Sequence, residues 1–435
     1  MISIENLYEI FQKYPKVFTD SRLAGQGGIY FALKGDKFDG NDFVESSLAN
    51  GANYAVTDRR TISSDERIVF VDDVLSTLQK LVNFHRRKLQ IPVLAITGTN
   101  GKTTTKELVT HVLSTKYKVL STEGNLNNHI GVPLTLLKIT SEHEFAVIEM
   151  GANHPGEIEF LCRIAEPDYG IITNVGMAHL EGFGSFEGVK KTKGELYNHI
   201  LKSGKGIFIN SANPHLLGMA PDSIEKYTYA ISEEDAELTG EVAGNTIKLV
   251  CRILFSKGWL YIKTHLTGAY NLENVLAASR IGLKFGIDPL EIQKGIENYI
   301  PSNNRSQVIR LKNTAIIADC YNANPSSMAA SINNFKQIEQ ENKTLVLGDM
   351  LELGNDSKAE HQKIVNLVVS YNMKDVFWVG KNFFHSDLPG DSLRFENVDE
   401  LISNIKKEIF DGKIVLIKGS RGIKLEKLLD FIVEK

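Results

Sequence analysis

The segment most suited to chemistry is a glycine loop between a predicted strand and a predicted helix. The loop reads Thr97-Gly98-Thr99-Asn100-Gly101-Lys102-Thr103-Thr104; it ends the apolar run at 93–97 and begins a helix predicted over 102–114. Glycines let several backbone N–H groups converge on one phosphate, and the helix N-terminus adds positive partial charge. Lys102 would contact the β- and γ-phosphates, and the Thr103 hydroxyl would bind Mg²⁺. The loop therefore predicts a site for a nucleoside triphosphate.

This loop departs from the general phosphate-loop pattern at one position. The pattern GxxxxGK[ST] requires glycine at position 96, where this chain has Ile96. An ordinary strand–turn–helix is the alternative interpretation. The Gly-Lys-Thr cluster at the junction of strand and helix favours the phosphate loop.

Polar side chains also follow two other apolar runs, which are typical of strands buried in a parallel sheet. Glu149 ends the run at 145–149, and His179 follows the run at 169–174. Ligands bind at the carboxyl ends of such strands, and carboxylate oxygens suit Mg²⁺. Taken alone, however, a strand-end glutamate is commonly solvated and a lone histidine is more often structural. The basic run that contains Lys193, at 190–193, is by itself typical of a solvated surface.

The elements that would position these residues fall into three α/β units. We expect a small N-terminal α/β unit over 1–83, a central P-loop-type unit with a mainly parallel sheet over 84–303, and a Rossmann-like doubly wound unit over 304–435. The first boundary falls on a helix predicted over 74–89. Strands are expected at 28–33, 54–57, 68–71, 246–253, 259–265, 314–319, 344–347, 375–379 and 414–418, and a further helix at 272–285.

Composition excludes several classes of protein. The 435 residues include 49 basic and 53 acidic side chains, a net charge of −4, so no global basic field favours nucleic acid as a partner. The three cysteines, Cys162, Cys251 and Cys320, are too far apart in sequence for a cysteine-rich zinc site, and a disulfide framework is not expected. The N-terminus lacks the pattern of a secretory signal, and no apolar run is long enough to span a membrane. We expect a cytoplasmic protein without membrane insertion.

The phosphate loop resembles that of the Mur ligases, ATP-dependent amide-forming enzymes that build the peptide of bacterial cell-wall precursors. Three other segments, at 123–133, 149–158 and 347–354, are similar to the branch of that family that adds D-alanyl-D-alanine. The Asp-Asn-Pro-Arg motif of the branch that adds diaminopimelate or lysine is absent from the chain. The resemblance covers nearly the whole sequence and is weakest in the first unit.

This resemblance assigns roles in activating a carboxylate by phosphorylation. It implies ATP, two Mg²⁺ sites and four residues near the metal, which are Thr103, Glu149, His179 and Lys193. Lys193 matches a lysine that CO₂ carbamylates in the family, which would supply an anion for the second Mg²⁺. The neighbouring lysines are excluded only by the resemblance. Lys102, Glu149, His179 and Lys193 are thus the expected catalytic group.

The resemblance also marks a nucleotide side and a substrate side. On the nucleotide side it implies Asn271 and Asn274 near adenine, Arg305 at a phosphate and Asp319 at the ribose. Asn271 could equally cap its helix. The substrate residues are Ser21 and Arg22 for the uridine nucleotide, Asn125, Asn127 and Asn128 for the muramoyl-peptide, and Arg421 for the carboxylate of D-alanyl-D-alanine. Turn formation by the asparagines and a surface ion pair by Arg421 are the alternatives.

The activity implied is an ADP-forming ligase of peptidoglycan synthesis. It would join UDP-N-acetylmuramoyl-tripeptide to D-alanyl-D-alanine through an acyl phosphate, acting as a monomer. One rival is another amide ligase of the same superfamily that adds a different amino acid. A second rival is a non-catalytic nucleotide switch, which has no need for Glu149, His179 and Lys193 together.

Overall fold

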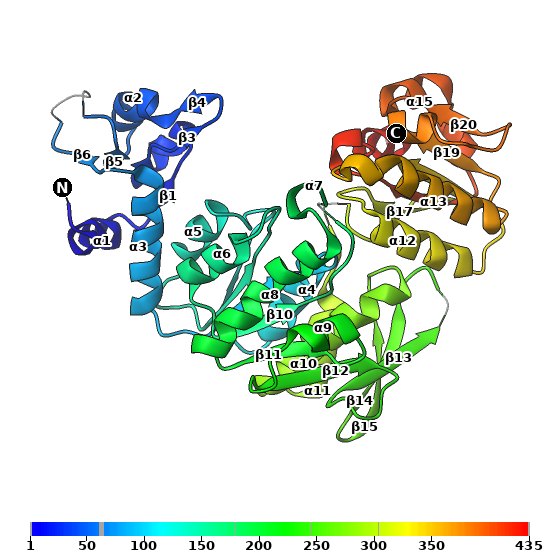
Figure 1. Cartoon of the computed structure of the whole chain (residues 1–435), viewed down its shortest axis with the longest axis horizontal. Helices are drawn as coiled ribbons and strands as arrows, with labels where there is room; N and C mark the ends of the chain where they lie inside the picture. Colours follow the sequence, from blue (N-terminus) through cyan, green and yellow to red (C-terminus); the bar gives the residue numbers. More distant parts are fainter. Residues whose placement is uncertain (1, 61–64, 179, 245, 303, 434–435) are drawn as a thin grey trace.

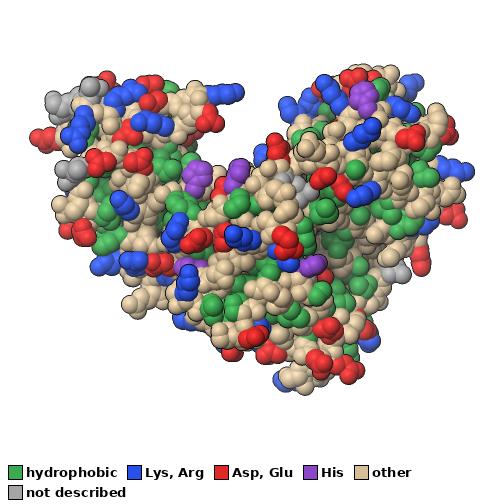
Figure 2. Space-filling view, viewed as in Figure 1, with side chains coloured by type: hydrophobic (Ala, Val, Ile, Leu, Met, Phe, Trp, Pro, Cys, Tyr) green, Lys and Arg blue, Asp and Glu red, His purple; other side chains and the backbone are tan. Residues whose placement is uncertain are grey.

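Three lobes follow one another along the chain, each built on its own sheet (Figure 1). The computed structural model describes residues 2–60, 65–178, 180–244, 246–302 and 304–433. The first and third lobes stand on either side of the middle lobe, and a broad hollow opens between them (Figure 2). No helix in these described ranges has the length and apolarity that crossing a bilayer requires.

The first lobe holds a parallel sheet of order β1-β2-β5-β6. Its strands are β1 (Val17–Phe18), β2 (Ile29–Phe31), β5 (Tyr54–Thr57) and β6 (Ile68–Phe70), with a hairpin of β3 (Lys34–Gly35) and β4 (Phe38–Asp39). Its helices are α1 (Ile4–Lys13), α2 (Val44–Ala49) and α3 (Val74–Lys88). Helix α3 begins where the Asp73 side chain accepts from the amide of Ser76 over 2.6 Å.

Helix α3 joins the first lobe to the middle one. It packs against α1 on one side and against α6 (Glu157–Ala165) of the middle lobe on the other (Figure 1). The buried guanidinium of Arg86 donates to Asp168 over 2.9 Å, and the Asn83 amide donates to the carbonyl of Arg163 over 3.0 Å. A single helix therefore fixes the position of one lobe on the next.

The middle lobe holds a nine-stranded sheet of order β15-β14-β13-β12-β11-β10-β7-β9-β8. The strands are β7 (Val93–Thr97), β8 (Val119–Ser121), β9 (Phe145–Glu149), β10 (Tyr169–Ile172), β11 (Gly206–Asn210), β12 (Lys226–Ile231), β13 (Thr239–Gly244), β14 (Val250–Phe255) and β15 (Gly258–Lys263). The helices are α4 (Lys102–Leu113), α5 (Gly131–Leu136), α6 (Glu157–Ala165), α7 (Leu180–Phe183), α8 (Phe186–Ser203), α9 (Pro214–Met219), α10 (Leu272–Lys284) and α11 (Pro289–Asn298). Among the described strands of this sheet, the β13–β14 and β14–β15 pairs are antiparallel and the other pairs are parallel.

The parallel part of this sheet explains the continuous apolar runs in the sequence. Every residue of β7, β9 and β10 is buried, because helices cover both faces of the sheet. The observed strands agree closely with those predicted here. In the antiparallel part the prediction was less accurate: the strand expected at 246–253 runs over Val250–Phe255, because the turn lies farther along the chain.

The third lobe is doubly wound, with a six-stranded sheet of order β16-β17-β21-β18-β19-β20. The strands are β16 (Gln307–Arg310), β17 (Ala315–Asp319), β18 (Lys343–Gly348), β19 (Val376–Val379), β20 (Leu393–Phe395) and β21 (Ile414–Lys418). The helices are α12 (Pro325–Gln337), α13 (Ser357–Ser370), α14 (Lys381–Phe384), α15 (Val398–Asn404) and α16 (Glu426–Val433). Strand β16 runs antiparallel to β17, and the other described pairs of this sheet are parallel. The predicted fold class, three α/β units with a Rossmann-like third, is confirmed.

Candidate active site

The glycine loop connects β7 to α4 as predicted, and the structure explains its unusual first position. Ile96 is fully buried in β7 and lies in register with Glu149 of β9, so position 96 belongs to the strand. Gly98 has a φ of 142°, and a Cβ there would meet the Thr173 hydroxyl at 2.0 Å. Gly101 has a φ of 79°, and a Cβ there would meet the Asn274 side chain at 2.6 Å. Both glycines are therefore required by backbone conformation and by close packing.

Lys102 stands at the first position of α4 and folds back over the loop. Its Nζ donates to the carbonyls of Gly98 over 2.9 Å and Thr99 over 3.0 Å. Desolvation lowers the pKa of Lys102; the nearby carboxylate of Glu149 opposes this shift, and Arg305 adds to it. The ammonium is thus held against the loop backbone, in desolvated surroundings that strengthen its attraction for an anion.

Glu149 and Thr103 meet at the carboxyl edge of the sheet. The Thr103 hydroxyl donates to Oε2 of Glu149 over 2.8 Å, and the Asn127 amide donates to Oε1 over 2.8 Å. Glu149 is only 2% exposed, and none of the ion pairs among the described residues includes it. A buried carboxylate is costly without a balancing charge. Its oxygens and the Thr103 hydroxyl are hard donors that suit Mg²⁺, so these two residues fit the predicted metal site.

The other two residues predicted to bind the metal are His179 and Lys193. His179 lies outside the described residues, and no group of three or more His, Cys, Asp or Glu side chains within the described ranges could hold a metal ion. Lys193 is described: it belongs to α8, is 2% exposed, and has its Nζ 5.5 Å from the centre of the Phe183 ring. Desolvation first, and then the charge of Lys102, lower its pKa to about 7. Lys193 is therefore not part of a solvated basic surface.

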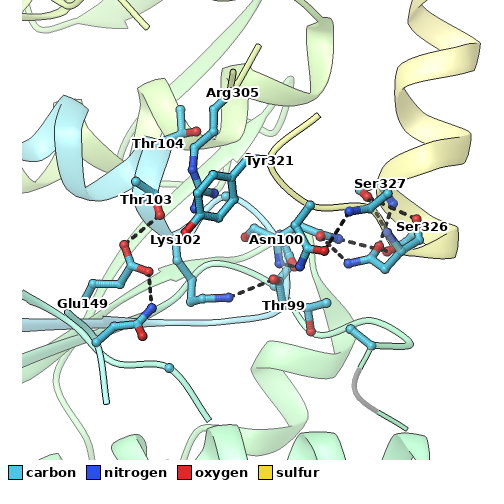
Figure 3. A pocket seen from close by; sticks show the side chains of 18 of the residues that line it. Thr99, Asn100, Lys102, Thr103, Thr104, Glu149, Arg305, Tyr321, Ser326 and Ser327 are labelled. Atoms are coloured by element: carbon cyan, nitrogen blue, oxygen red, sulfur yellow. Dashed lines mark hydrogen bonds between the residues drawn. The ribbon is translucent and has the colours of Figure 1, made fainter. Parts of the chain in front are cut away.

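A cavity of about 700 Å³ opens over the loop, between the middle and third lobes (Figure 3). The middle lobe contributes residues of the glycine loop, Glu149 and the asparagines of the 123–133 segment. The third lobe contributes Arg305, Asp319 and the start of α12. The cavity therefore brings together residues of two lobes that are far apart in sequence. Ser21, Arg22, Lys193 and Arg421 are not among its described lining residues.

The two asparagines predicted near adenine form a chain of hydrogen bonds with α4. The Thr105 hydroxyl donates to Oδ1 of Asn274 over 3.0 Å, and the Asn274 amide donates to Oδ1 of Asn271 over 2.8 Å. The Asn271 amide donates in turn to the carbonyl of Thr267 over 2.7 Å. No side-chain cap bond from Asn271 to α10 is present in this described segment, so the alternative role as a helix cap is wrong.

Asp319 and Arg305 form the wall of the cavity in the third lobe. The Lys418 ammonium donates to Oδ2 of Asp319 over 2.5 Å. Although burial would raise the pKa of Asp319, the ion pair with Lys418 holds it below its usual range. The Arg305 guanidinium lies 3.6 Å from the centre of the Tyr321 ring, and Figure 3 shows the two side chains together above the glycine loop.

The residues predicted for the substrates are distributed over all three lobes. Asn125, Asn127 and Asn128 line the cavity, but the Asn128 side chain accepts from the amide of Gly131 over 2.9 Å at the start of α5. Arg22 is exposed and pairs with Asp20, and this contact lowers the pKa of Asp20 to about 2. Ser21 is the first residue of the short 3₁₀ helix Ser21–Gln26 in the first lobe, to which Arg22 also belongs. Arg421 lies beside the cavity residue Tyr321, whose ring centre is 5.4 Å from its guanidinium.

Comparison with known proteins agrees with this geometry. Residues 13–95 match a model described as the Mur ligase family catalytic domain, residues 96–282 the Mur ligase middle domain, and residues 304–421 the Mur ligase glutamate ligase domain. The UDP-N-acetylmuramoyl-tripeptide–D-alanyl-D-alanine ligase of Bacillus subtilis strain 168 is 34% identical, over 96% of this chain and 93% of that protein. The chain belongs to the Mur ligase family.

Further relatives place this Mur ligase beside one branch of the family. The Escherichia coli K12 ligase of the same name is 32% identical over 96% of this chain and 93% of that protein. The crystal structure of MurF from Acinetobacter baumannii has a TM-score of 0.86 at 32% identity, covering 96% and 93% of the two chains. The MurF ligase of Thermotoga maritima, solved in complex with ADP, has a TM-score of 0.82 at 27% identity, covering 96% of each chain.

Sequence reasoning missed several cavity residues of this Mur ligase, and three of them lie at or just after the ends of strands in the third lobe. Asn324 and Ser326 follow β17, and Lys418 ends β21. Asn324 precedes a proline and caps α12, a pattern that marks a helix start in any sequence. The Asn-Pro pattern thus predicts the start of a helix, but it does not predict a contact with another lobe.

Proposed function

We propose that this Mur ligase joins D-alanyl-D-alanine to UDP-N-acetylmuramoyl-tripeptide and cleaves ATP to ADP and phosphate as it does so. The observation that carries the proposal is the cavity in which the glycine loop and Glu149 of the middle lobe face Arg305 and Asp319 of the third lobe. A triphosphate bound to the loop would have its transferable end near Lys102. The relatives at 32–34% identity carry this activity in their names.

The chemistry has two steps. An oxygen of the tripeptide's terminal carboxylate attacks the γ-phosphorus, the bond to the β-phosphate oxygen breaks, and ADP leaves. The dipeptide amine then attacks the carbonyl carbon of the acyl phosphate and loses a proton, and the tetrahedral intermediate expels phosphate. Lys102 and Arg305 stabilise the charge on the transferring group, and the cavity between the lobes limits the access of water.

Mg²⁺ would be held by Thr103 and Glu149, with His179 and a carbamate on Lys193 as the further ligands. When bound, the metal neutralises phosphate charge. The burial of Lys193 supports the carbamate, because its lowered pKa leaves a large neutral fraction near pH 7, and only the neutral amine reacts with CO₂.

The remaining assignments concern the substrates and the state of the protein. Ser21 and Arg22 bind the uridine nucleotide across the hollow, and Arg421 binds the dipeptide carboxylate. Asn271 and Asn274 lie on the adenine side, and Asp319 faces the ribose. The protein acts as a cytoplasmic monomer with domains at 1–83, 84–303 and 304–435. Its product serves peptidoglycan synthesis, and so cell shape and division.

A substrate panel tests the proposal. Phosphate release is measured with ATP, Mg²⁺ and UDP-N-acetylmuramoyl-tripeptide that ends in lysine or in diaminopimelate, against single amino acids and dipeptides. We expect turnover with D-alanyl-D-alanine and one of the two tripeptides. Turnover with a single amino acid would instead identify another amide ligase of the superfamily, and ATP binding without turnover would identify a nucleotide switch.

A further inference from the structure

The side chain of Asn100 in the glycine loop faces the third lobe, whereas its backbone is held by the middle lobe. The backbone N–H of Asn100 donates to Oδ1 of Asn174 over 2.9 Å. Its carbonyl accepts from the Thr173 hydroxyl over 2.6 Å and from the Asn174 amide over 3.1 Å. Because the peptide is fixed on this side, the Asn100 side chain is presented in one direction.

Two residues at the start of α12 bond to that side chain, and one of them, Ser326, is seen beside Asn100 in Figure 3. The Asn324 amide donates to Oδ1 of Asn100 over 2.8 Å, and the Asn100 amide donates to the Ser326 hydroxyl over 2.9 Å. The Ser326 hydroxyl then donates to Oδ1 of Asn324 over 2.9 Å. The three side chains form a closed ring of hydrogen bonds, which we call the interlobe ring.

The orientation of the interlobe ring is fixed from the third lobe. Asn324 is 8% exposed and caps α12, because its Oδ1 also accepts from the amide of Ser327 over 2.9 Å. With that oxygen committed to the cap, the Asn324 Nδ2 must face Asn100. Each side chain of the ring is therefore held in one orientation. A shift or rotation of the third lobe would break the hydrogen bonds of the ring together.

The interlobe ring lies in the wall of the same cavity as Lys102 and Arg305. Arg305 is in the third lobe, yet its charge contributes to the lowered pKa of Lys102 in the middle lobe. The distance between these two cations depends on how the third lobe is docked. Other contacts also join the two lobes, such as the Ala269 N–H, which donates to Oδ1 of Asn334 over 3.2 Å, and the Tyr270 and Ser306 hydroxyls, 3.4 Å apart. The interlobe ring differs from these contacts because it is made by the loop that would cradle the phosphates.

We propose that Asn324 and Ser326 are positioning residues, which dock the third lobe on the phosphate loop through the Asn100 side chain and so set the place of Arg305 beside the nucleotide. The inference rests on the proposed function, because it takes the loop as the phosphate site. Coupling between two events is reciprocal, so docking strengthens nucleotide binding and a bound nucleotide strengthens docking.

A double-mutant cycle tests this coupling through the dissociation constant of ADP, measured by calorimetry. Asn100→Ala and Ser326→Ala should each weaken ADP binding by about three- to tenfold, the range for one hydrogen bond. The double variant should bind ADP as tightly as the more weakly binding of the two single variants, because the loss of one partner already opens the ring. Ser327→Ala is the matched control: among the described residues, this hydroxyl bonds to the backbone of Asn324 and to no side chain of the ring. Its effect should add to that of Asn100→Ala.

Asn324→Ser separates docking from helix capping. Serine caps a helix about as well as asparagine, but it is too short to reach Asn100. This variant should keep the unfolding temperature of the parent and weaken ADP binding as much as Ser326→Ala does. Unchanged ADP binding in Asn324→Ser, or additive effects of Asn100→Ala and Ser326→Ala, would overturn the proposal.

A distance measurement tests docking without any ligand or turnover. Fluorophores are attached at Lys202→Cys on α8 and Lys358→Cys on α13, both exposed positions; the native Cys162, Cys251 and Cys320 are buried. In Asn324→Ser and Ser326→Ala, the distribution of distances between the fluorophores should broaden and its mean should increase. Ser327→Ala should leave the distribution unchanged. An unchanged distance in the first two variants refutes the ring as the docking contact. A parent protein that binds no ADP refutes the proposed function instead, and the distance result still decides the docking.

Discussion

The hydroxyl of Thr103 donates a 2.8 Å hydrogen bond to Oε2 of Glu149. The two residues are far apart in sequence, but β7 and β9 are parallel neighbours, so their carboxyl ends meet at one edge of the sheet. Asn127 holds the second oxygen of the carboxylate over 2.8 Å. A buried anion is thus kept in place by neutral donors at the entrance of the glycine loop.

Glu149→Gln should abolish turnover and leave the fold intact. The amide keeps the size of the side chain and an acceptor for Thr103, but it removes the charge that would hold Mg²⁺. We expect phosphate release to fall on the order of 10²-fold or more, because transition-state charge would be less well stabilised. The unfolding temperature should stay equal or rise, because a buried charge is costly. Wild-type rates at the same Mg²⁺ concentration would contradict the assignment.

Lys102→Ala should also remove turnover at saturating ATP. The ammonium is held over the loop by the carbonyls of Gly98 and Thr99, where a phosphate would replace those acceptors. Losing a charged contact in a desolvated site should lower kcat on the order of 10²-fold or more. Single-turnover phosphate release measures this step directly. A kcat close to that of the parent would mean that the loop does not bind the transferring phosphate.

Local features of this site could be predicted from the sequence, whereas contacts between lobes could not. The glycine loop and Glu149 were predictable, because each follows an apolar run whose strand character is encoded locally. The mismatch at Ile96 is resolved only by the sheet, in which that residue pairs as part of β7. The burial of Lys193 was likewise hidden, because its neighbours in sequence are basic and the packing of α8 decides which lysine faces inward.

The third lobe shows the limit of prediction most clearly. Asp319 was predicted as a strand-end acid, but its partner Lys418 lies at the end of another strand and was not identified. The two meet because β17 and β21 are adjacent and parallel, and Asp319 is in register with Lys418. The contact of Asn324 with Asn100 depends on the docking of two separately folded lobes, which no local pattern encodes.

Tyr321 should matter through its ring and not through its hydroxyl. The ring centre lies 3.6 Å from the Arg305 guanidinium and 5.4 Å from that of Arg421, so the ring can orient both cations. Each such contact contributes about 0.5–2 kcal/mol, so Tyr321→Leu should raise the KM for ATP and for D-alanyl-D-alanine by about 2- to 30-fold. Tyr321→Phe, the matched control, should keep both values. Equal effects of the two substitutions would contradict stacking as the cause.

Lys193 should make stability depend on pH in a definite direction. Burial lowers its pKa from the ordinary 10.5 to about 7, so between these values the unfolded chain binds more protons than the folded protein. The free energy of unfolding attributable to this group therefore rises as pH increases from about 7 towards 10.5, and falls as pH is lowered through the same window. Lys193→Gln, a neutral substitution, should flatten this slope in urea titrations performed at several pH values without added CO₂. Lys190→Ala, at a more exposed position on the same helix, should leave the slope unchanged.

The same titration should govern activation by CO₂. A carbamate forms when the neutral amine attacks CO₂ and loses a proton, so protein depleted of CO₂ should recover activity with added bicarbonate more readily at pH 8 than at pH 6. The transition should lie near the pKa of about 7. Lys193→Ala should be inactive at every pH, and a small carboxylic acid that fills the vacated volume with an anion should partly restore turnover. Full activity of Lys193→Ala, or bicarbonate dependence that survives in this variant, would show that another group supplies the anion.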